Sequence, residues 1–190
     1  MATATNIVTH LYDFYDHAAT VVRDLESAGV PTKEVSIIAN RGEDRALVDE
    51  PSSGASTGAT VGTMLGAGTG LLAGLGVLAI PGIGPVVAAG WLAATAAGAV
   101  AGLAAGGIVG ALTDLGVSED HAHIYAEGIS RGGALVSVRT SSLPRSTIMS
   151  IMGKYEPVDP EQRGADYRKD GWSRFEDRVD NVSQTDRPIR

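Results

Sequence analysis

The sequence predicts an α+β protein with a helical insertion, and three observations support this. Residues 1–50 and 114–158 each alternate strand-like with helix-like patterns. Residues 51–113 lie between them and contain no Asp, Glu, Lys, Arg or His at 63 consecutive positions. Within that stretch glycine recurs at every fourth residue. We therefore expect two halves of one small α/β sandwich, in a ferredoxin-like arrangement, that are separated by a glycine-rich antiparallel helical hairpin.

Composition excludes several classes of protein. The chain has 190 residues, of which 44% are hydrophobic, enough for a folded core. Its 22 acidic residues outnumber its 15 basic ones and give a net charge of −7, so we expect no nucleic-acid partner. The absence of cysteine excludes disulfides, thiol nucleophiles and thiolate metal sites. The N-terminal residues show no basic segment followed by an apolar run, so we expect no cleaved secretory signal.

The first charged half is predicted to form a strand, a helix and a second strand. Residues 3–10 are rich in Thr, Val and Ile, which favour a strand. Apolar residues recur at intervals of three and four over 12–28, which indicates an amphipathic helix, and Gly29 is placed to end it. Residues 35–39 form the second predicted strand, and the polar residues after it, up to position 50, are expected to be a linker.

The second charged half is predicted to form a helix, a strand, a short helix and a last strand. Ser118 is placed to cap a helix that ends at the glycine pair 132–133. Residues 134–139 alternate as a strand does, and Pro144 is placed to begin a short helix. Residues 155–158 are predicted to form a last edge strand.

The glycine spacing predicts helices that pack closely. Residues four apart share one face of a helix, so each arm would carry a furrow without side chains, along which another backbone can approach. Because glycine costs about 0.8–1 kcal/mol against alanine in an exposed helix, such arms need lipid or a packed interface around them. The predicted turn between the arms consists of Pro81, Gly82, Gly84 and Pro85. The predicted helix-packing positions are Gly54, Gly58, Gly62, Gly66, Gly70, Gly74, Gly90, Ala94, Gly98, Gly102, Gly106 and Gly110.

Two environments for this hairpin stay open. The arm over residues 58–80 would be about 34 Å long as a helix, against about 30 Å of bilayer hydrocarbon. The favoured interpretation is a hairpin that inserts into a lipid bilayer and self-associates, on the cytoplasmic side of the inner membrane. The alternative is a soluble homo-oligomeric assembly in the cytoplasm, a filament or a closed particle, with the hairpins packed in its interior. In both cases the partner is a second copy of the chain.

No combination of residues predicts catalysis. His121 and His123 are two apart, a spacing that does not chelate a metal well on a helix. His10, Asp13 and His17 could share a helical face, but no fourth ligand is evident. The glycine-rich segments lack the Lys-Ser/Thr of a phosphate-binding loop, and no G-x-S-x-G motif occurs. We expect a non-enzymatic protein with no cofactor, no metal and no small-molecule substrate.

Residues 159–190 have the mixed charge and low hydrophobicity of a polar tail. The composition favours disorder. The alternative is that Tyr167, Trp172 and Phe175 anchor the tail on a neighbouring molecule, since aromatic side chains often serve that purpose.

Three segments of the chain carry a family resemblance: LYDFYDHAATVVRDLESAGVPTKEVSIIA, LLAGLGVLAIPGIGPVVAAG and GALTDLGVSEDHAHIYAEGISRGGALVSVR. Over about residues 6–155 the chain resembles the bacterial general stress protein 17M-like family, also described as heat-induced stress proteins. The resemblance rests on the IPGIGP reversal, the YAEGISRGG helix and the ALVSVR strand. It implies a stress-associated bacterial protein, cytoplasmic or membrane-associated, of undetermined biochemical activity, and it transfers no catalytic residue.

Overall fold

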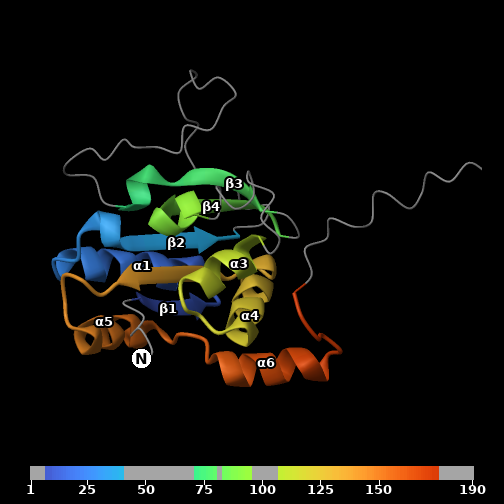
Figure 1. The fold of residues 1–190 in the computed structure, drawn as a ribbon. Helices are drawn as coiled ribbons and strands as arrows, with labels where there is room; N and C mark the ends of the chain where they lie inside the picture. The colour runs from blue at the N-terminus through green and yellow to red at the C-terminus, as the bar shows by residue number, and fades with distance from the viewer. Residues whose placement is uncertain (1–6, 41–70, 81–82, 96–106, 176–190) are drawn as a thin grey trace, which may run out of the picture.

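The computed structural model describes residues 7–40, 71–80, 83–95 and 107–175, and the structural statements below refer to these residues. They form a mixed fold of helices around an antiparallel sheet, so the predicted α+β class is confirmed (Figure 1). The strands are β1 (Ile7–Tyr12), β2 (Val35–Ala39), β3 (Gly76–Ile80), β4 (Gly84–Gly90) and β5 (Ala134–Arg139). The α-helices are α1 (Tyr15–Ser27), α3 (Gly107–Asp114), α4 (Glu119–Ser130), α5 (Arg145–Met152) and α6 (Pro160–Lys169). Short 3₁₀ helices are η1 (Thr32–Glu34), η3 (Leu71–Gly74) and η4 (Gly153–Tyr155), and residues 91–95 are helical.

The strands lie in the order β1-β5-β2-β4-β3, and each is antiparallel to its neighbours. β1 and β2 are therefore parallel to each other, with β5 between them. Because β5 comes last in the sequence, the centre of the sheet is complete only when residues 134–139 take their place between two much earlier strands.

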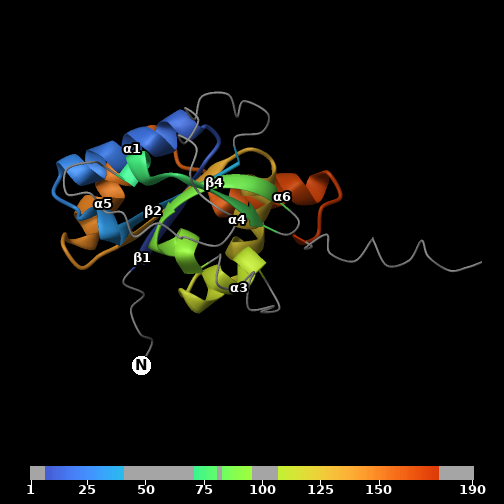
Figure 2. The same ribbon diagram turned by 90° about the horizontal axis from the view of Figure 1, so that it is seen from above.

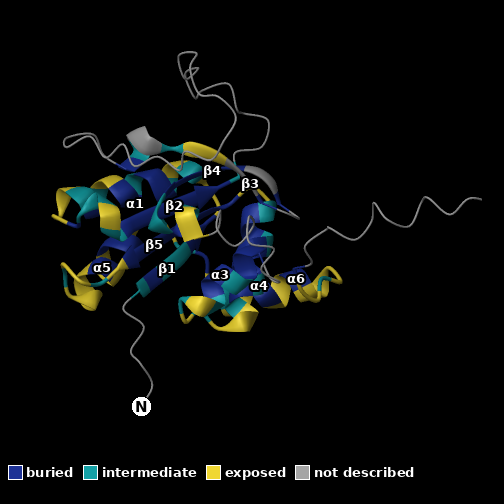
Figure 3. Ribbon diagram, turned by 45° about the horizontal axis from the view of Figure 1, so that its top comes forward, coloured by how far each residue is buried: buried dark blue, intermediate teal, exposed yellow. Residues whose placement is uncertain are grey.

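Helices cover both faces of the sheet. α1 and α5 lie on one face, and α3 and α4 lie on the other (Figure 2). Successive residues of a strand point to opposite faces, so Ile37 joins the α1 side of the core and Ile38 joins the α4 side. All five residues of β2 are buried as a result, which explains their nearly continuous apolar sequence (Figure 3).

A β-hairpin occupies the centre of the stretch for which the glycine spacing predicts a helical hairpin. β3 pairs with β4, and β4 pairs with β2, so both strands extend the main sheet. In β4, Val87 and Ala89 contact the α1 side of the core while Val86 and Ala88 contact the α4 side. Burial on both faces favours a strand of β-branched and small apolar residues, whereas regular glycines weaken a helix. The helical prediction is therefore wrong for residues 76–80 and 84–90.

The charged halves follow their predictions more closely. β2 and β5 have the predicted bounds, and α1 and α4 lie within the predicted helices. Ser118 caps α4 by accepting a hydrogen bond from the backbone N–H of His121 at 3.4 Å. β1 begins at Ile7, so only the second half of the strand predicted over 3–10 lies in the described residues.

The predicted edge strand over residues 155–158 is wrong. The chain makes the 3₁₀ turn η4 at this point, and Glu156 has a φ of 52°, which breaks an extended backbone. One backbone hydrogen bond still joins this segment to β1: the N–H of Val158 donates to the carbonyl oxygen of Leu11 at 2.8 Å.

Candidate functional site: the neutral edge of the sheet

One end of the sheet is built entirely from uncharged residues. We call η3, β3 and β4 together (residues 71–80 and 83–90) the neutral edge. β3 is its outermost strand, and within the described residues it pairs with β4 alone. The side chain of Val77 on β3 is 59% exposed, and yellow on this strand marks its exposed residues (Figure 3). An exposed, uncharged strand at the end of a sheet is a surface for association.

In addition to the pairing of β4 with β2, side-chain hydrogen bonds hold the neutral edge at two places. The backbone N–H of Leu71 donates to the Oε1 atom of Glu26 on α1 at 2.6 Å, and the Leu71 side chain is buried. On β2, the buried Ser36 hydroxyl donates to the carbonyl oxygen of Ala89 at 2.8 Å and accepts from the N–H of Leu92 at 3.2 Å. These contacts hold the first residue of the edge and the last residues of β4.

Gly90 marks the point where the strand gives way to a helix. Its φ is +88°, a conformation that favours glycine. A Cβ atom here would collide with the carbonyl oxygen of Val35 and lie 2.8 Å from the Cα of Ser36. Gly90 therefore allows close approach of β4 to β2, and the helix-packing role predicted for it is wrong.

The other predicted packing positions have separate outcomes. Gly74 lies in the 3₁₀ helix η3, so its predicted place on an α-helical furrow is wrong. Ala94 lies in the short helical stretch 91–95 and is exposed, and Gly110 lies in α3. Their helical placement agrees with the prediction, and their packing role stays a prediction. The remaining positions lie outside the described residues: Gly54, Gly58, Gly62, Gly66, Gly70, Gly98, Gly102 and Gly106.

The chain reverses where the sequence predicts a turn, but the turn joins strands. The backbone N–H of Ile83 donates to the carbonyl oxygen of Ile80 at 3.1 Å. Gly84 and Pro85 are the first residues of β4. Pro81 and Gly82 lie outside the described residues.

The opposite edge of the sheet, β1, is covered by the chain itself. The Arg145 guanidinium donates to the carbonyl oxygen of Ile7 at 2.9 Å, and the backbone N–H of Val158 donates to the carbonyl oxygen of Leu11. His10 lies between these two contacts in the sequence, and burial together with the nearby Arg145 charge lowers the pKa of its imidazole. The two edges of the sheet therefore differ: β1 is protected by polar contacts, and β3 carries neither a charge nor a proline.

The C-terminal segment docks on its own domain. α6 packs on α4, where Gly164 lies so close to Ile124 that a Cβ would be 2.6 Å from the Ile124 Cδ1 atom. Arg163 makes two hydrogen bonds of 2.7 Å to the carboxylate of Asp13, which holds the pKa of Asp13 below its ordinary value. The prediction of disorder is wrong for residues 160–169.

The aromatic residues of this segment do act as anchors, but within the same molecule. Tyr167 and Phe175 are buried, and Trp172 is half-buried with its ring in a T-shaped contact, 5.5 Å from that of Tyr167. The guanidinium of Arg131, the C-cap residue of α4, lies 4.3 Å from the centre of the Tyr167 ring. Docking of these three residues on a neighbouring molecule is therefore not what the structure shows. Residues 176–190 lie outside the described part of the chain.

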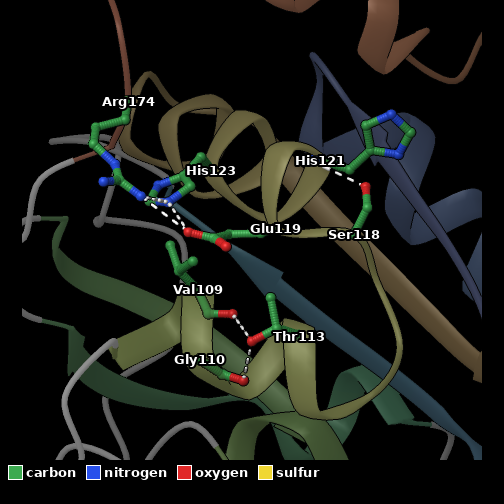
Figure 4. A network of polar contacts seen from close by, with 8 residues as sticks. All are labelled: Val109, Gly110, Thr113, Ser118, Glu119, His121, His123 and Arg174. Atoms are coloured by element: carbon green, nitrogen blue, oxygen red, sulfur yellow. Dashed lines mark hydrogen bonds and ion pairs between the residues drawn. The ribbon is translucent and has the colours of Figure 1, made fainter.

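A polar network holds the end of this segment against α4. Figure 4 shows the side chains of Glu119, His123 and Arg174 directed toward one another. Arg174 Nη2 lies 3.0 Å from both the Glu119 Oε1 atom and the His123 Nε2 atom. Since a guanidinium can only donate, Nε2 of His123 accepts this hydrogen bond. The network belongs to the docking of the tail.

Four of the residues weighed and rejected as metal ligands in the sequence have other contacts in the structure. Asp13 pairs with Arg163, and the His17 ring lies 5.5 Å from that of Phe14. His121 lies 3.5 Å from Glu161 on α6 and His123 contacts Arg174, so the two imidazoles have separate partners. No three His, Asp or Glu side chains gather as a metal site within the described ranges.

Two features of the structure were not predicted from the sequence: the strands β3 and β4, and the contact between Arg163 and Asp13. The strands β3 and β4 were hidden by the glycine periodicity, although VLAI and PVVAA within them have the composition of buried strands. The hydrogen bonds between Arg163 and Asp13 join residues 150 positions apart, so no local sequence pattern predicts them.

Comparisons with protein-family models, with curated proteins and with solved structures return no match. In the part of the chain that the structure describes, none of the helices has both the length and the apolar character needed to cross a bilayer. The neutral edge is thus the most distinctive feature of the described structure, and what it offers chemically is a surface for association.

Proposed function

We propose that this protein is a non-enzymatic homo-oligomer whose copies join at the neutral edge, and that it serves a bacterial stress response in a structural role. The observation that carries the proposal is the separation of charge along the chain and in the fold. All 22 acidic and 15 basic residues lie outside the stretch 51–113, which supplies the neutral edge and its exposed Val77. Apolar, uncharged surface at an open strand favours contact with another protein surface.

The stress-related part of the proposal is supported by the resemblance in sequence to general stress proteins. The structural role is supported by the contacts of the histidines and carboxylates described above, which are engaged in docking the C-terminal segment. Loss of growth on heat or salt stress after deletion of the gene in its host would test the stress assignment separately from self-association.

We also propose a ferredoxin-like arrangement for four of the strands, three from the charged halves (β1, β2 and β5) and β4 from the uncharged stretch. β1 and β2 are parallel, joined by α1, and have β5 between them; β4 and β5 are parallel and have β2 between them. Two interlocked units of this kind support the comparison. Helices on both faces of the sheet distinguish the present fold from a simple two-layer sandwich.

A lipid bilayer is the second candidate partner, favoured by the absence of any charge from residues 51–70 and 96–106. A hairpin that inserts into a bilayer could not be the predicted helical hairpin over residues 51–113, because residues 76–80 and 84–90 belong to the sheet. The assembly without membrane insertion agrees better with that placement, and it is the version we favour.

Fractionation of cells that express the full chain separates the two candidates. Membranes are washed with alkaline carbonate, and the mass of the protein in the detergent-free supernatant is measured by light scattering. We expect the protein in the supernatant, with a mass that is a multiple of 19.5 kDa. Retention in the washed membranes would support the bilayer candidate instead, and a 19.5 kDa monomer would contradict self-association.

Two further variants test whether the glycine spacing contributes to assembly. Gly66→Leu and Gly102→Leu place large side chains on the predicted furrows, outside the described residues. Smaller oligomers in both variants would assign the furrows to the interface. An unchanged size would restrict the interface to the neutral edge.

A further inference from the structure

From the backbone geometry of the neutral edge, we infer that the self-association surface is β3 itself, which pairs antiparallel with β3 of a second copy. The inference rests on the proposed function and names the strand and the register through which it would operate. The pairing would join two five-stranded sheets into one continuous sheet across a twofold axis.

Within the described residues, the edge strand β1 is covered by other parts of the chain and β3 is not, which favours β3 as the strand that pairs with a second copy. Natural proteins guard exposed edges with charges, prolines or a covering segment. On β1, Ile7 and Leu11 already have their outward carbonyl oxygens occupied by Arg145 and Val158. The five residues of β3, GVLAI, include neither a charge nor a proline.

The register with β4 shows which backbone groups face outward. Ala79 is opposite Pro85, which has no N–H, so this pair cannot exchange two hydrogen bonds. On β1 the odd-numbered Ile7 and Leu11 direct their carbonyl oxygens outward, so the even-numbered residues of β1 face β5. Carried across β5 and β2, this alternation makes odd-numbered residues of β4 face β2 and even-numbered ones face β3. By alternation, the N–H and C=O groups of Val77 and Ala79 are directed to the open side of β3.

These open groups fit a second copy of the same strand. In an antiparallel pair centred on Leu78, Val77 lies opposite Ala79 of the partner copy, and the two outward residues of each strand form hydrogen-bonded pairs. Every neighbouring pair in the sheet is already antiparallel, so the pairing continues the existing pattern.

Charge also favours a second copy over a different protein as the occupant. Each molecule carries a net charge of −7, so copies repel one another over most of their surface. The neutral edge is the end of the sheet at which two copies meet without bringing like charges together. A heterologous partner attracted by that negative charge would be expected to meet the charged surfaces instead.

Val77→Pro tests the backbone contact directly. Proline removes the outward N–H, and the residue before it is Gly76, which has no side chain to clash with the proline ring. A proline whose missing N–H faces solvent is tolerated on an edge strand, so the monomer should keep its fold, as checked by circular dichroism and melting temperature. Each dimer loses two hydrogen bonds, so the dissociation constant should rise at least about tenfold.

The matched control is Val77→Thr, which keeps the N–H and the branched side chain and should keep the dissociation constant close to that of the wild type. If Val77→Pro folds and associates as tightly as Val77→Thr, the edge inference is overturned while self-association stands. If the wild-type chain is itself monomeric, the proposed function fails together with the inference.

A cysteine cross-link gives a second test that does not depend on proline. The chain has no cysteine, so Leu78→Cys introduces a single thiol at the predicted twofold axis. Directly opposite residues of a non-hydrogen-bonded pair have Cα atoms about 4.5 Å apart, within the range for a disulfide. Mild oxidation should give a covalent dimer of Leu78→Cys. Met149→Cys, at a 46% exposed position on α5, is the control for random collision, and equal cross-linking of both variants would overturn the inference.

Discussion

Gly90 shows at the scale of one residue why a glycine pattern can mislead. Gly90 begins a series that continues at four-residue intervals with Ala94 and Gly98, which suggests a helical face. Its own φ of +88° and its contact with β2 instead give it a local role at the end of a strand. Glycine spacing reports where side chains are absent, and close backbone approach occurs in sheets as well as between helices.

Replacing Gly90 by alanine should destabilise the protein strongly. Gly90→Ala combines an unfavourable φ with a backbone collision, and we expect the free energy of unfolding to fall by about 3 kcal/mol in urea denaturation. Gly29→Ala is the control, because Gly29 has a φ of +94° but no atom within 4 Å of the added Cβ, so its loss should be about 1 kcal/mol. Equal losses for the two variants would contradict the packing role of Gly90.

His10 should make the fold sensitive to mild acid. Its pKa in the folded protein lies below the ordinary value of 6.5, so between the two pKa values the unfolded chain binds more protons. The stability associated with neutral His10 is therefore present above about pH 6.5 and is lost as the pH falls toward the folded-state pKa. His10→Gln removes this titration and should lose less stability than the wild type between about pH 7.5 and pH 5.5.

Melting temperatures across that pH range check the sign of the effect. His17→Gln on α1 is the control for the removal of one histidine elsewhere. A His10→Gln variant whose stability falls as steeply as that of the wild type would refute the assignment.

At the scale of elements, most of the charged halves could be predicted and the neutral stretch could not. Helices α1 and α4 carry local signals, such as the Ser118 cap and the Gly29 stop, which depend on residues close in sequence. β4 is a strand because it pairs with β2 and contacts the core on both faces, and β3 is a strand because it pairs with β4; both depend on residues distant in sequence. The position of α6 could not be predicted for the same reason, because it depends on contacts with Asp13 near the start of the chain and with Ile124 on α4.

The docking of α6 depends on the absence of a side chain at Gly164. Gly164→Leu would press against Ile124 on α4 and push α6 away, so the tail should be cleaved faster in limited proteolysis and the unfolding free energy should fall by about 1–3 kcal/mol. Gly153→Leu is the control, since nothing lies within 4 Å of its added Cβ. Protection of the tail in Gly164→Leu equal to that in Gly153→Leu would show that α6 does not depend on this contact.

At the scale of the whole molecule, the uncharged strands β3 and β4 lie at one end of the sheet, and the strands of the charged halves make up the rest of it. The charged halves form α1, α4 and α5 and the protected edge β1, while the uncharged stretch supplies nearly all of α3 and the other end of the sheet. The membrane hairpin and the assembly were open alternatives in the sequence because both require uncharged surface. The sheet pairing of β3 and β4 favours assembly, since these strands are committed to the folded domain.

Sedimentation equilibrium of the wild-type chain, without detergent and over a series of salt concentrations, tests this account most directly. The interface proposed here contains no ion pair, while each copy carries a charge of −7. Salt screens the repulsion between copies, so we predict an average mass above 19.5 kDa that rises with both protein and salt concentration. A mass of 19.5 kDa at every concentration, or association that weakens as salt is added, would contradict the account.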